Sequence, residues 1–578
     1  MSADYRYHAD VIRRHIALVP GYDALRQRLS VDVDVGADTL AQVLDAAAVF
    51  AEDVLAPINR AGDLEGCRFQ DGRVLSAPGY SGAWKQLAEA GWLAVDQPAE
   101  YGGQGLPSFV NAACRELFDC ACMAIGMLSG PTRAATQVLL EFGEKAICDE
   151  WIPRFVTGEW SATICISEAD AGSDVGRIRS RALPAGDGSW LVTGEKMWTS
   201  FGDNDLVERI GHFLLARTPD APPGSAGLSL FLVPNRVRDA DGDWVSNGVT
   251  PRRIEEKLGL HGSPTCAMGF EQARAHLIGH PHRGLSQMFV MIQGMRLMVA
   301  IEGVGMAFGA VQMTQSYAET RKQGGDPAVP PVPIARHADI QRQILGMASR
   351  VEVLRGLVYE IAVRLDAERM AVDEPTGREA TRSRMVTQWL LPIIKASCAE
   401  AGFEVPNEGI QVLGGAGYTR EWPLEQWMRD ARMMSIAEGS TGIQALDLVH
   451  RRLRRDRGES LAAFLDTATG EIASADPGLA TSALSVLDRL RKIGAAFLDP
   501  QSRPRDAEAG AVAFLNVAML AATAWIAVRL ASDDKDDAIA KRLAACGRYW
   551  LSDVDLKAAQ QEKLALIGAA RLAEYEYL

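Results

Sequence analysis

Apolar residues recur at helical spacing over the first part of the chain. Between residues 40 and 55 they stand at Leu40, Val43, Leu44, Ala47, Phe50 and Ala51. This is the pattern of a helix that buries one face, and Pro57 predicts a break just after it. A second helix is predicted over 131–142, with proline at its start and Gly143 just past its end. Residues 1–160 are therefore expected to form a helical domain.

The period of the pattern changes between about residues 161 and 285. Short apolar runs alternate there with clusters of glycine, proline and aspartate, and the runs fall at 163–167, 190–193, 212–216, 228–233 and 266–270. Many short strands at this spacing predict a compact β domain or barrel.

Long helical patterns return after residue 285. They cover 286–320, 340–365, 381–402 and 443–453, and then 480–495, 509–531 and 536–550. We expect one helical domain over 286–455 and an additional one over 456–578. The proline-rich stretch 326–333 predicts a stiff loop between helices, and a Pro-x-x-Pro ligand for a partner domain is the alternative. The fold class is therefore mainly α with a central β-barrel domain.

One segment, 509–528, has no charged residue and needs a membrane test. It is rich in alanine, whose transfer energy is small, so it predicts a buried bundle helix and no membrane span. The first residues contain acidic side chains and no apolar run, which is unlike a signal peptide.

Net charge and cysteine usage narrow the function classes. The net charge of −14 argues against nucleic acid as a partner, because neutralising phosphates needs a basic surface. The 9 cysteines are scattered without a Cys-x-x-Cys pair, which favours a reducing, cytoplasmic setting. His280 and His282 lie in a glycine- and proline-rich turn without nearby carboxylates, so no metal site is expected.

The stretch 411–452 combines two features of an active site. Gly414, Gly415 and Gly417 form a loop whose backbone can approach a phosphate. Glu438 follows, flanked by small residues and just before a predicted helix. The residues alone leave two roles open for Glu438: a catalytic base, or a solvated glutamate at a helix N-terminus.

Five blocks of sequence resemble the acyl-CoA dehydrogenase family, in particular its larger branch with a C-terminal extension. The blocks are 101–105, 165–174, 194–200, 257–265 and 411–452. The resemblance implies a helical domain, a small β-barrel and a four-helix domain with FAD between them. It also implies that an acyl-CoA thioester is desaturated between its α and β carbons.

By this resemblance Glu438 is the base that takes the α-proton, while flavin N5 accepts the hydride. A bound acyl chain that excludes water would raise the pKa of the carboxyl towards the working range. The backbone N–H of Glu438 would polarise the thioester oxygen. Some relatives carry the base on another helix, where this chain has Met295, which cannot serve. Glu302 lies about two turns further along and is a poor substitute.

The same resemblance assigns cofactor contacts. Ile164, Ile166 and Ser167 would follow the flavin edge, Trp198 would cover its face and Ser200 would lie near N5. The remaining contacts would be Gly172, Ser173 and Ser440 within the subunit, and Gln411, Gly414, Gly415, Gly417, Arg321 and Gln323 on the FAD of the neighbouring subunit. An obligate oligomer follows, and the extension favours a homodimer. The alternative for Trp198 is an ordinary core residue, and the alternative for the glycines is an ordinary flexible loop.

Four residues are expected to contact the substrate: Ser173, Arg296, Ala437 and Gly439. Arg296 matches a family position near CoA, with an ion pair on a helix surface as the alternative. Ala437 stands where many relatives have tyrosine, which predicts a roomier or differently lined acyl cavity.

The leading hypothesis is an FAD-dependent acyl-CoA dehydrogenase of fatty acid β-oxidation that passes electrons to an electron-transferring flavoprotein. Three alternatives are kept: dehydrogenation of 3-methylthiopropionyl-CoA as the specific activity, an acyl-CoA oxidase that uses O₂, and a flavin-binding scaffold without turnover.

Overall fold

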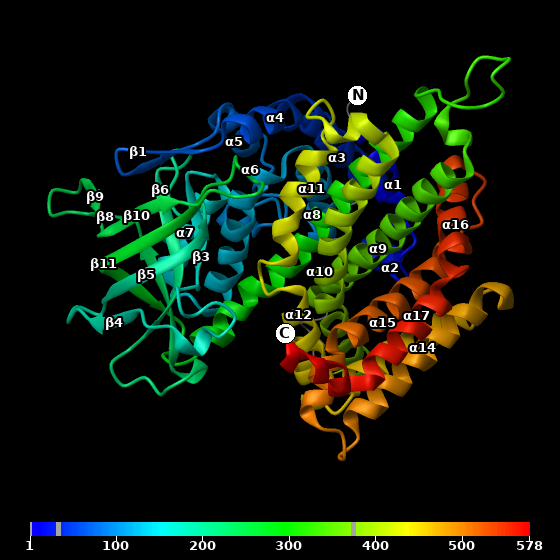
Figure 1. Cartoon of the computed structure of the whole chain (residues 1–578). Helices are drawn as coiled ribbons and strands as arrows, with labels where there is room; N and C mark the ends of the chain where they lie inside the picture. The colour runs from blue at the N-terminus through cyan, green and yellow to red at the C-terminus, as the bar shows by residue number, and fades with distance from the viewer. Residues whose placement is uncertain (1–2, 30–35, 371–376) are drawn as a thin grey trace. The chain divides into compact units, whose positions relative to one another are not determined.

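The computed structural model describes residues 3–29, 36–370 and 377–578 (Figure 1). The chain folds into two compact units that interleave along the sequence. Unit 1 comprises Met1–Ala48, Ala112–Cys120 and Val299–Leu578. Unit 2 comprises Val49–Asn111 and Ala121–Met298. The division into four domains by sequence range stays a prediction.

The strands of unit 2 form the expected β domain. They are β1 (Arg68–Gln70), β2 (Arg73–Leu75), β3 (Trp160–Cys165), β4 (Arg181–Pro184), β5 (Trp190–Ser200), β6 (Arg209–Arg217), β7 (Leu228–Pro234), β8 (Arg236–Arg238), β9 (Trp244–Ser246), β10 (Val249–Ile254) and β11 (Thr265–Ile278). The pairings β11–β5, β5–β4, β4–β6, β6–β7 and β7–β11 close into a ring, with β3 beside β6 and β10 beside β11. The predicted central barrel is confirmed.

The barrel excludes water because its strands alternate apolar residues towards a common interior. Phe231, Phe270 and Val192 belong to that core and are fully or almost fully buried. A second core of unit 2 surrounds Trp151 and Trp160, where the guanidinium of Arg209 stacks over both rings. This packing holds the start of β3, and Ile164 and Ile166 at its far end, where a predicted cofactor segment begins, pack against the same core.

Two helix boundaries predicted from proline are wrong. Helix α3 (Ala37–Phe50) continues through a π-helical turn, η1 (Ala51–Leu55), into α4 (Ala56–Glu65), so the chain does not break at Pro57. The wider turn absorbs the missing N–H, and proline sits in the first turn of α4. Likewise α6 (Ser108–Phe142) starts well before Pro131 and kinks instead at Cys122. Gly143 does cap its end.

The shorter elements complete the N-terminal half of the chain. They are α1 (Tyr5–Ala17), α2 (Tyr22–Leu29), α5 (Tyr80–Glu89), η2 (Ala99–Tyr101), α7 (Lys145–Val156), η3 (Val175–Arg177) and η4 (Ser225–Gly227).

Unit 1 is built from long antiparallel helices. They are α8 (Gly284–Thr320, shared with unit 2), α9 (Ala338–Met370), α10 (Arg378–Leu413), α11 (Leu424–Ala431) and α12 (Thr441–Val449), with the short turns η5 (Ile334–Arg336), η7 (Gly414–Tyr418), η8 (Arg432–Ser435) and η9 (His450–Arg455). Helices α8 and α10 approach closely, because a side chain at Gly303 would collide with the backbone of Cys398. The predicted loop 326–333 contains no helix or strand.

The C-terminal extension is helical, as predicted. It consists of α13 (Glu459–Ile472), α14 (Pro477–Leu498), α15 (Pro504–Ala531), α16 (Ala538–Leu551), α17 (Val554–Ile567) and η10 (Gly568–Tyr577). Within the described residues, α8 and α15 have the length and hydropathy of membrane spans. Their apolar windows are 89% and 83% buried inside the protein, which is the behaviour of core helices.

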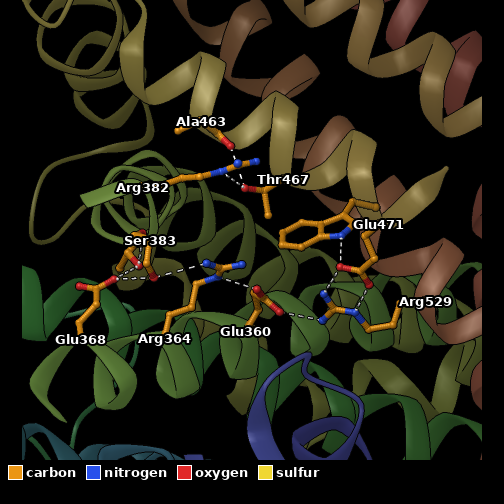
Figure 2. A network of polar contacts seen from close by, with 11 residues as sticks. Glu360, Arg364, Glu368, Arg382, Ser383, Ala463, Thr467, Glu471 and Arg529 are labelled. Carbon is orange, nitrogen blue, oxygen red and sulfur yellow. Dashed lines mark hydrogen bonds and ion pairs between the residues drawn. The ribbon is translucent and has the colours of Figure 1, made fainter. Parts of the chain in front are cut away.

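Ion pairs tie the extension to the long helices of unit 1 (Figure 2). Arg529 of α15 donates to Glu360 of α9 over 2.8 Å and to Glu471 of α13 over 2.7 Å. The Arg529 and Glu360 side chains are only 7% and 1% exposed. Because water does not compete at such a site, the pairing fixes how α15 lies against α9.

Candidate active site

Glu438 lies on a tight turn between η8 and α12 in unit 1. Its φ of 54° and the φ of 89° at Gly439 place two successive residues in the left-handed region. For a glutamate this conformation costs about 1–2 kcal/mol, so surrounding contacts must hold it. Ser440 then caps α12, its hydroxyl accepting from the backbone N–H of Ile443 at 3.5 Å. The turn therefore presents a half-buried carboxyl just outside a helix N-terminus.

Lys395 of α10 is the main anchor of this turn. Its fully buried ammonium donates to the carbonyls of Met434, Ala437 and Gly439 at 2.8, 2.7 and 2.8 Å. An ammonium has three donors, and all three are used on one turn. We did not predict this role from sequence, although a lone lysine within the apolar run before Cys398 was a signal.

Gln444 supplies a second anchor from α12. Its side-chain amide donates to the carbonyls of Glu438 and Gly439 at 3.0 and 3.1 Å. Thr441, one turn earlier, donates to Glu400 of α10 at 2.5 Å. The backbone carbonyls of Ala437, Glu438 and Gly439 are thus fixed.

A second carboxyl, that of Glu302 on α8, lies within the electrostatic range of Glu438 and Lys395. It is 0% exposed. Burial, followed by the charges of Asp119 and Glu438, raises the pKa of Glu302 well above its ordinary value. The sequence spacing predicted that Glu302 is a poor substitute for the base. It did not show that Glu302 lies within the electrostatic range of Glu438.

In unit 2 the predicted flavin-edge segment follows β3. Ile164 and Ile166 are half-buried against the Trp151 core, and the Ser167 carbonyl accepts from the N–H of Met197 at 3.0 Å. The fully buried Lys196 donates to the Ile166 carbonyl at 3.0 Å and to Glu168 at 2.7 Å. A buried cation therefore holds this segment against β5.

Glu168 connects the same segment to the next loop. It accepts from the N–H groups of Arg179 and Ser180 at 2.7 and 3.1 Å, and from the Ser180 hydroxyl at 2.6 Å. Burial alone would raise the pKa of Glu168, but Lys196 and these donors hold it below the ordinary value. The ionised carboxylate thus orders the backbone on both sides of the predicted phosphate loop.

Trp198 is exposed in a way that a core tryptophan is not. Its side chain is 59% exposed and its φ is 62°, at a bulge where the register of β5 against β11 shifts. Exposing a large aromatic ring and straining its backbone both cost free energy, and such combinations concentrate at functional sites. The plain-core alternative for Trp198 is therefore wrong.

The other predicted contacts of unit 2 differ in accessibility. Gly172 and Ser173 are exposed, and a side chain at Gly172 would meet no atom within 4 Å. Ser200 is half-buried at the end of β5. Arg296 is only 4% exposed, so the alternative of a helix-surface ion pair is wrong.

The glycine loop of unit 1 shows which glycines the chain itself requires. Gly417 packs against the last turn of α10, where a side chain would come within 2.6 Å of the Ile410 carbonyl. Gly414 has a φ of 61° and ends α10. Gly415 has neither a positive φ nor any atom within 4 Å of a built side chain. Nothing in the described part of the chain demands glycine there, which fits close approach by a group outside the chain.

The residues predicted to reach the neighbouring subunit lie on the surface of unit 1. Gln411, Gly414, Gly415, Arg321 and Gln323 are all exposed. Arg321 and Gln323 border a short loop closed by the N–H of Gln323 donating to the Val332 carbonyl at 2.9 Å. The predicted site residues thus fall into two sets: Glu438 and its turn with this surface in unit 1, and the β3–β5 segments with Arg296 in unit 2.

Comparison with known proteins identifies the class. Sequence models of the acyl-CoA dehydrogenase N-terminal, middle and C-terminal domains match residues 37–159, 163–273 and 282–453. The chain therefore belongs to the acyl-CoA dehydrogenase family. This confirms the predicted family and enzyme class, with FAD as the cofactor of that class.

Individual relatives narrow the comparison. The chain is 35% identical over 523 residues to the 3-methylmercaptopropionyl-CoA dehydrogenase of Ruegeria pomeroyi, covering 88% of this chain and 87% of the relative. It is 34% identical over 448 residues to the broad-specificity linear acyl-CoA dehydrogenase FadE5 of Mycobacterium tuberculosis, covering 75% and 72%. A Bacillus anthracis acyl-CoA dehydrogenase, solved in complex with FAD, has the same fold with a TM-score of 0.75, 21% identity, and coverage of 92% and 88%.

Proposed function

We propose that this protein catalyses the FAD-dependent α,β-dehydrogenation of an acyl-CoA thioester, with Glu438 as the base. The observation that carries the proposal is the catalytic turn. Glu438 is held in a left-handed conformation by Lys395 and Gln444, which fix the carbonyls around it. A residue held in that conformation by buried donors is constrained for a purpose other than helix capping, because Ser440 already caps α12.

The residues would divide the work as follows. The carboxylate of Glu438 takes the α-proton, and the Glu438 N–H stabilises negative charge on the thioester oxygen. FAD, when bound, supplies the hydride acceptor. Trp198, Ser200 and the Ile164–Ser167 segment would hold the flavin ring, while Gly172 and Ser173 leave room for phosphate.

A neighbouring subunit is part of the proposal. Arg321, Gln323, Gln411, Gly414 and Gly415 are all exposed, and built side chains at the two glycines would meet no atom within 4 Å. A group from another subunit can therefore approach this surface. We propose that these residues bind the FAD of a second copy in a homodimer. We also propose an electron-transferring flavoprotein as the electron acceptor. A cytoplasmic location stays a prediction.

The substrate is proposed to be a short acyl-CoA, with 3-methylthiopropionyl-CoA as the first candidate. The relative of that activity matches this chain over 88% of its length, including the extension. Ala437, half-buried beside the base, leaves more space than the tyrosine of many relatives. A broader range of linear acyl-CoA substrates is the second candidate, which the match to FadE5 supports.

Anaerobic flavin bleaching tests the function. The FAD-loaded protein is titrated with a panel of acyl-CoA esters of increasing length and with 3-methylthiopropionyl-CoA. We expect loss of the flavin absorbance with at least one ester, fastest with the methylthio ester. If no ester bleaches the fully loaded protein, the proposal is wrong, and peroxide formation in air at the rate of bleaching would instead identify an oxidase.

Replacing Glu438 by glutamine tests the base. The Glu438→Gln variant should bind FAD normally and lose about 10²- to 10⁴-fold in kcat, because removing a positioned general base typically costs that much. Glu425→Gln, an exchange on the partly buried surface of α11, is the matched control and should keep normal turnover. Near-normal turnover of Glu438→Gln would place the base elsewhere.

A further inference from the structure

Glu302 is a buried group that the proposed reaction does not use. It lies on α8 next to Gly303, where α8 touches α10, and the neighbouring Gly402 of α10 in turn meets Met434 of the catalytic turn. Its side chain is 0% exposed. Neither carboxyl oxygen has a hydrogen-bond partner among the described residues. An ionised carboxylate in such a place would be very costly, whereas a protonated carboxyl is tolerated.

The charged groups around Glu302 come from three elements. Asp119 and Arg115 lie on α6, Lys395 on α10, and Glu438 on the turn before α12. The two cations are already engaged: Arg115 donates to Asp119 at 2.6 Å, and the ammonium of Lys395 is used on three carbonyls. Both cations act to lower the pKa of Glu302, but burial and the neighbouring carboxyls outweigh them.

Asp119 does not favour ionisation of Glu302 either. Burial raises the pKa of Asp119 to about 6 in spite of Arg115, and its second oxygen also has no hydrogen-bond partner in the described parts of the chain. Two buried carboxyls near a third one resist simultaneous ionisation, because their negative charges repel in a medium of low dielectric constant.

We propose that Glu302 is a positioning residue for Glu438: a second carboxyl that keeps its proton while Glu438 is ionised, so that the base faces a neutral acid and not another anion. This inference rests on the proposed role of Glu438. The pair holds one proton before the reaction. When the Cα–H bond of the substrate breaks and its proton moves to Glu438, the pair holds two, and the proton of Glu302 is not transferred.

The proposal has a consequence for activity. Above the pH at which Glu302 ionises, a second buried anion stands beside the base and opposes the negative charge that develops on the substrate carbonyl. Activity therefore falls at alkaline pH in the wild type. Glutamine has the same shape and cannot ionise, so Glu302→Gln should stay within about threefold of wild type near pH 7 and move the alkaline limb of the kcat/KM profile up by at least one unit.

A stability cycle tests the coupling without turnover. Thermal unfolding of the FAD-loaded wild type, Glu302→Gln, Glu438→Gln and the double variant is followed from pH 5 to pH 8. A buried acid with a raised pKa binds more protons in the folded state, so its stability is lost as pH rises from the unfolded towards the folded pKa. The Tm of Glu302→Gln should exceed that of wild type by a margin that grows with pH. Per pH unit, the ratio of the two unfolding equilibrium constants should change by up to tenfold.

The double variant then isolates the pair. In the Glu438→Gln background the part of the repulsion that comes from Glu438 is gone, while burial and Asp119 remain, so the advantage of Glu302→Gln should level off at lower pH. Glu360→Gln is the matched control: Glu360 is equally buried but is paired with Arg529, so its exchange should lower Tm without that growth. Glu302→Met replaces the variant if Glu302→Gln does not fold, with the same expected trend.

The outcomes are distinguishable. A Tm difference between Glu302→Gln and wild type that does not change with pH, or that Glu438→Gln leaves unaltered, overturns the inference, as does an unmoved alkaline limb. Failure of every acyl-CoA to bleach the wild-type flavin overturns the proposed function instead, and the stability cycle still reports on the two carboxyls.

Discussion

Replacing Lys395 by methionine removes the cation under the catalytic turn and keeps the length of the side chain. Three carbonyls lose a donor, but not equally. The Met434 carbonyl is buried, so leaving it unpaired costs about 1–3 kcal/mol. The Ala437 carbonyl is partly buried and costs less, and that of Gly439 keeps its bond from Gln444. Together the loss is about 2–4 kcal/mol.

The same change also has a functional cost. Without Lys395 the left-handed conformation at Glu438 loses its main anchor and keeps the hydrogen bonds from Gln444. A displacement of about 1 Å of a catalytic group can cost about 10²-fold in rate. We therefore expect Lys395→Met to fold, to retain FAD, and to lose about 10- to 100-fold in kcat with a smaller change in KM.

The assay pairs thermal unfolding with steady-state kinetics on the ester that bleaches the flavin fastest. Lys145→Met is the matched control, since the Lys145 side chain is 81% exposed and pairs with Asp149 within one helix. A surface pair of this kind contributes about 0.3–0.5 kcal/mol, so the control should behave like wild type. If Lys395→Met matches wild type within twofold in kcat and unfolds at the same temperature, the anchoring argument is refuted.

Two further predictions concern the stability of unit 1. Arg529→Met should destabilise it by about 1–3 kcal/mol, because Glu360 and Glu471 each lose a charged donor, while Glu360 keeps its pair with Arg364 (Figure 2); an unchanged Tm would show that the pairing does not hold α15. His8→Gln should gain in Tm relative to wild type as pH falls below 6.5, since burial lowers the pKa of His8 and the unfolded chain then binds the extra proton. A Tm difference that is constant from pH 7.5 to pH 5 would contradict the neutral, buried histidine.

Much of the fold could be predicted from local pattern. The barrel follows from short apolar runs between turns, and the long helices from their 3.6-residue period. The proline boundaries failed because a π turn before Pro57 and a long, well-packed helix around Pro131 offset the missing N–H. Tertiary packing outweighs a local preference of this size.

The candidate site was predicted unevenly. Glu438, the glycine loop and Trp198 stand in motifs that the sequence displays. Lys395 and Gln444 stand far from those motifs or look like ordinary helix residues, and their role depends on where α10 and α12 bring their side chains. The spacing of residues along α8 did not predict a role for Glu302, because spacing does not show which helices pack around a residue.

The sequence by itself determined the family and the enzyme class, because five motifs keep their residue types and order; the identity of the base stays a prediction. Only the tertiary structure decided what surrounds Glu438: a buried ammonium that fixes its turn, and a fully buried carboxyl on α8, Glu302, whose pKa is raised by burial and by charges that include Glu438. The physical reason is that a side chain's chemistry is local, whereas its pKa and its orientation are set by burial and by charges that arrive from distant parts of the chain.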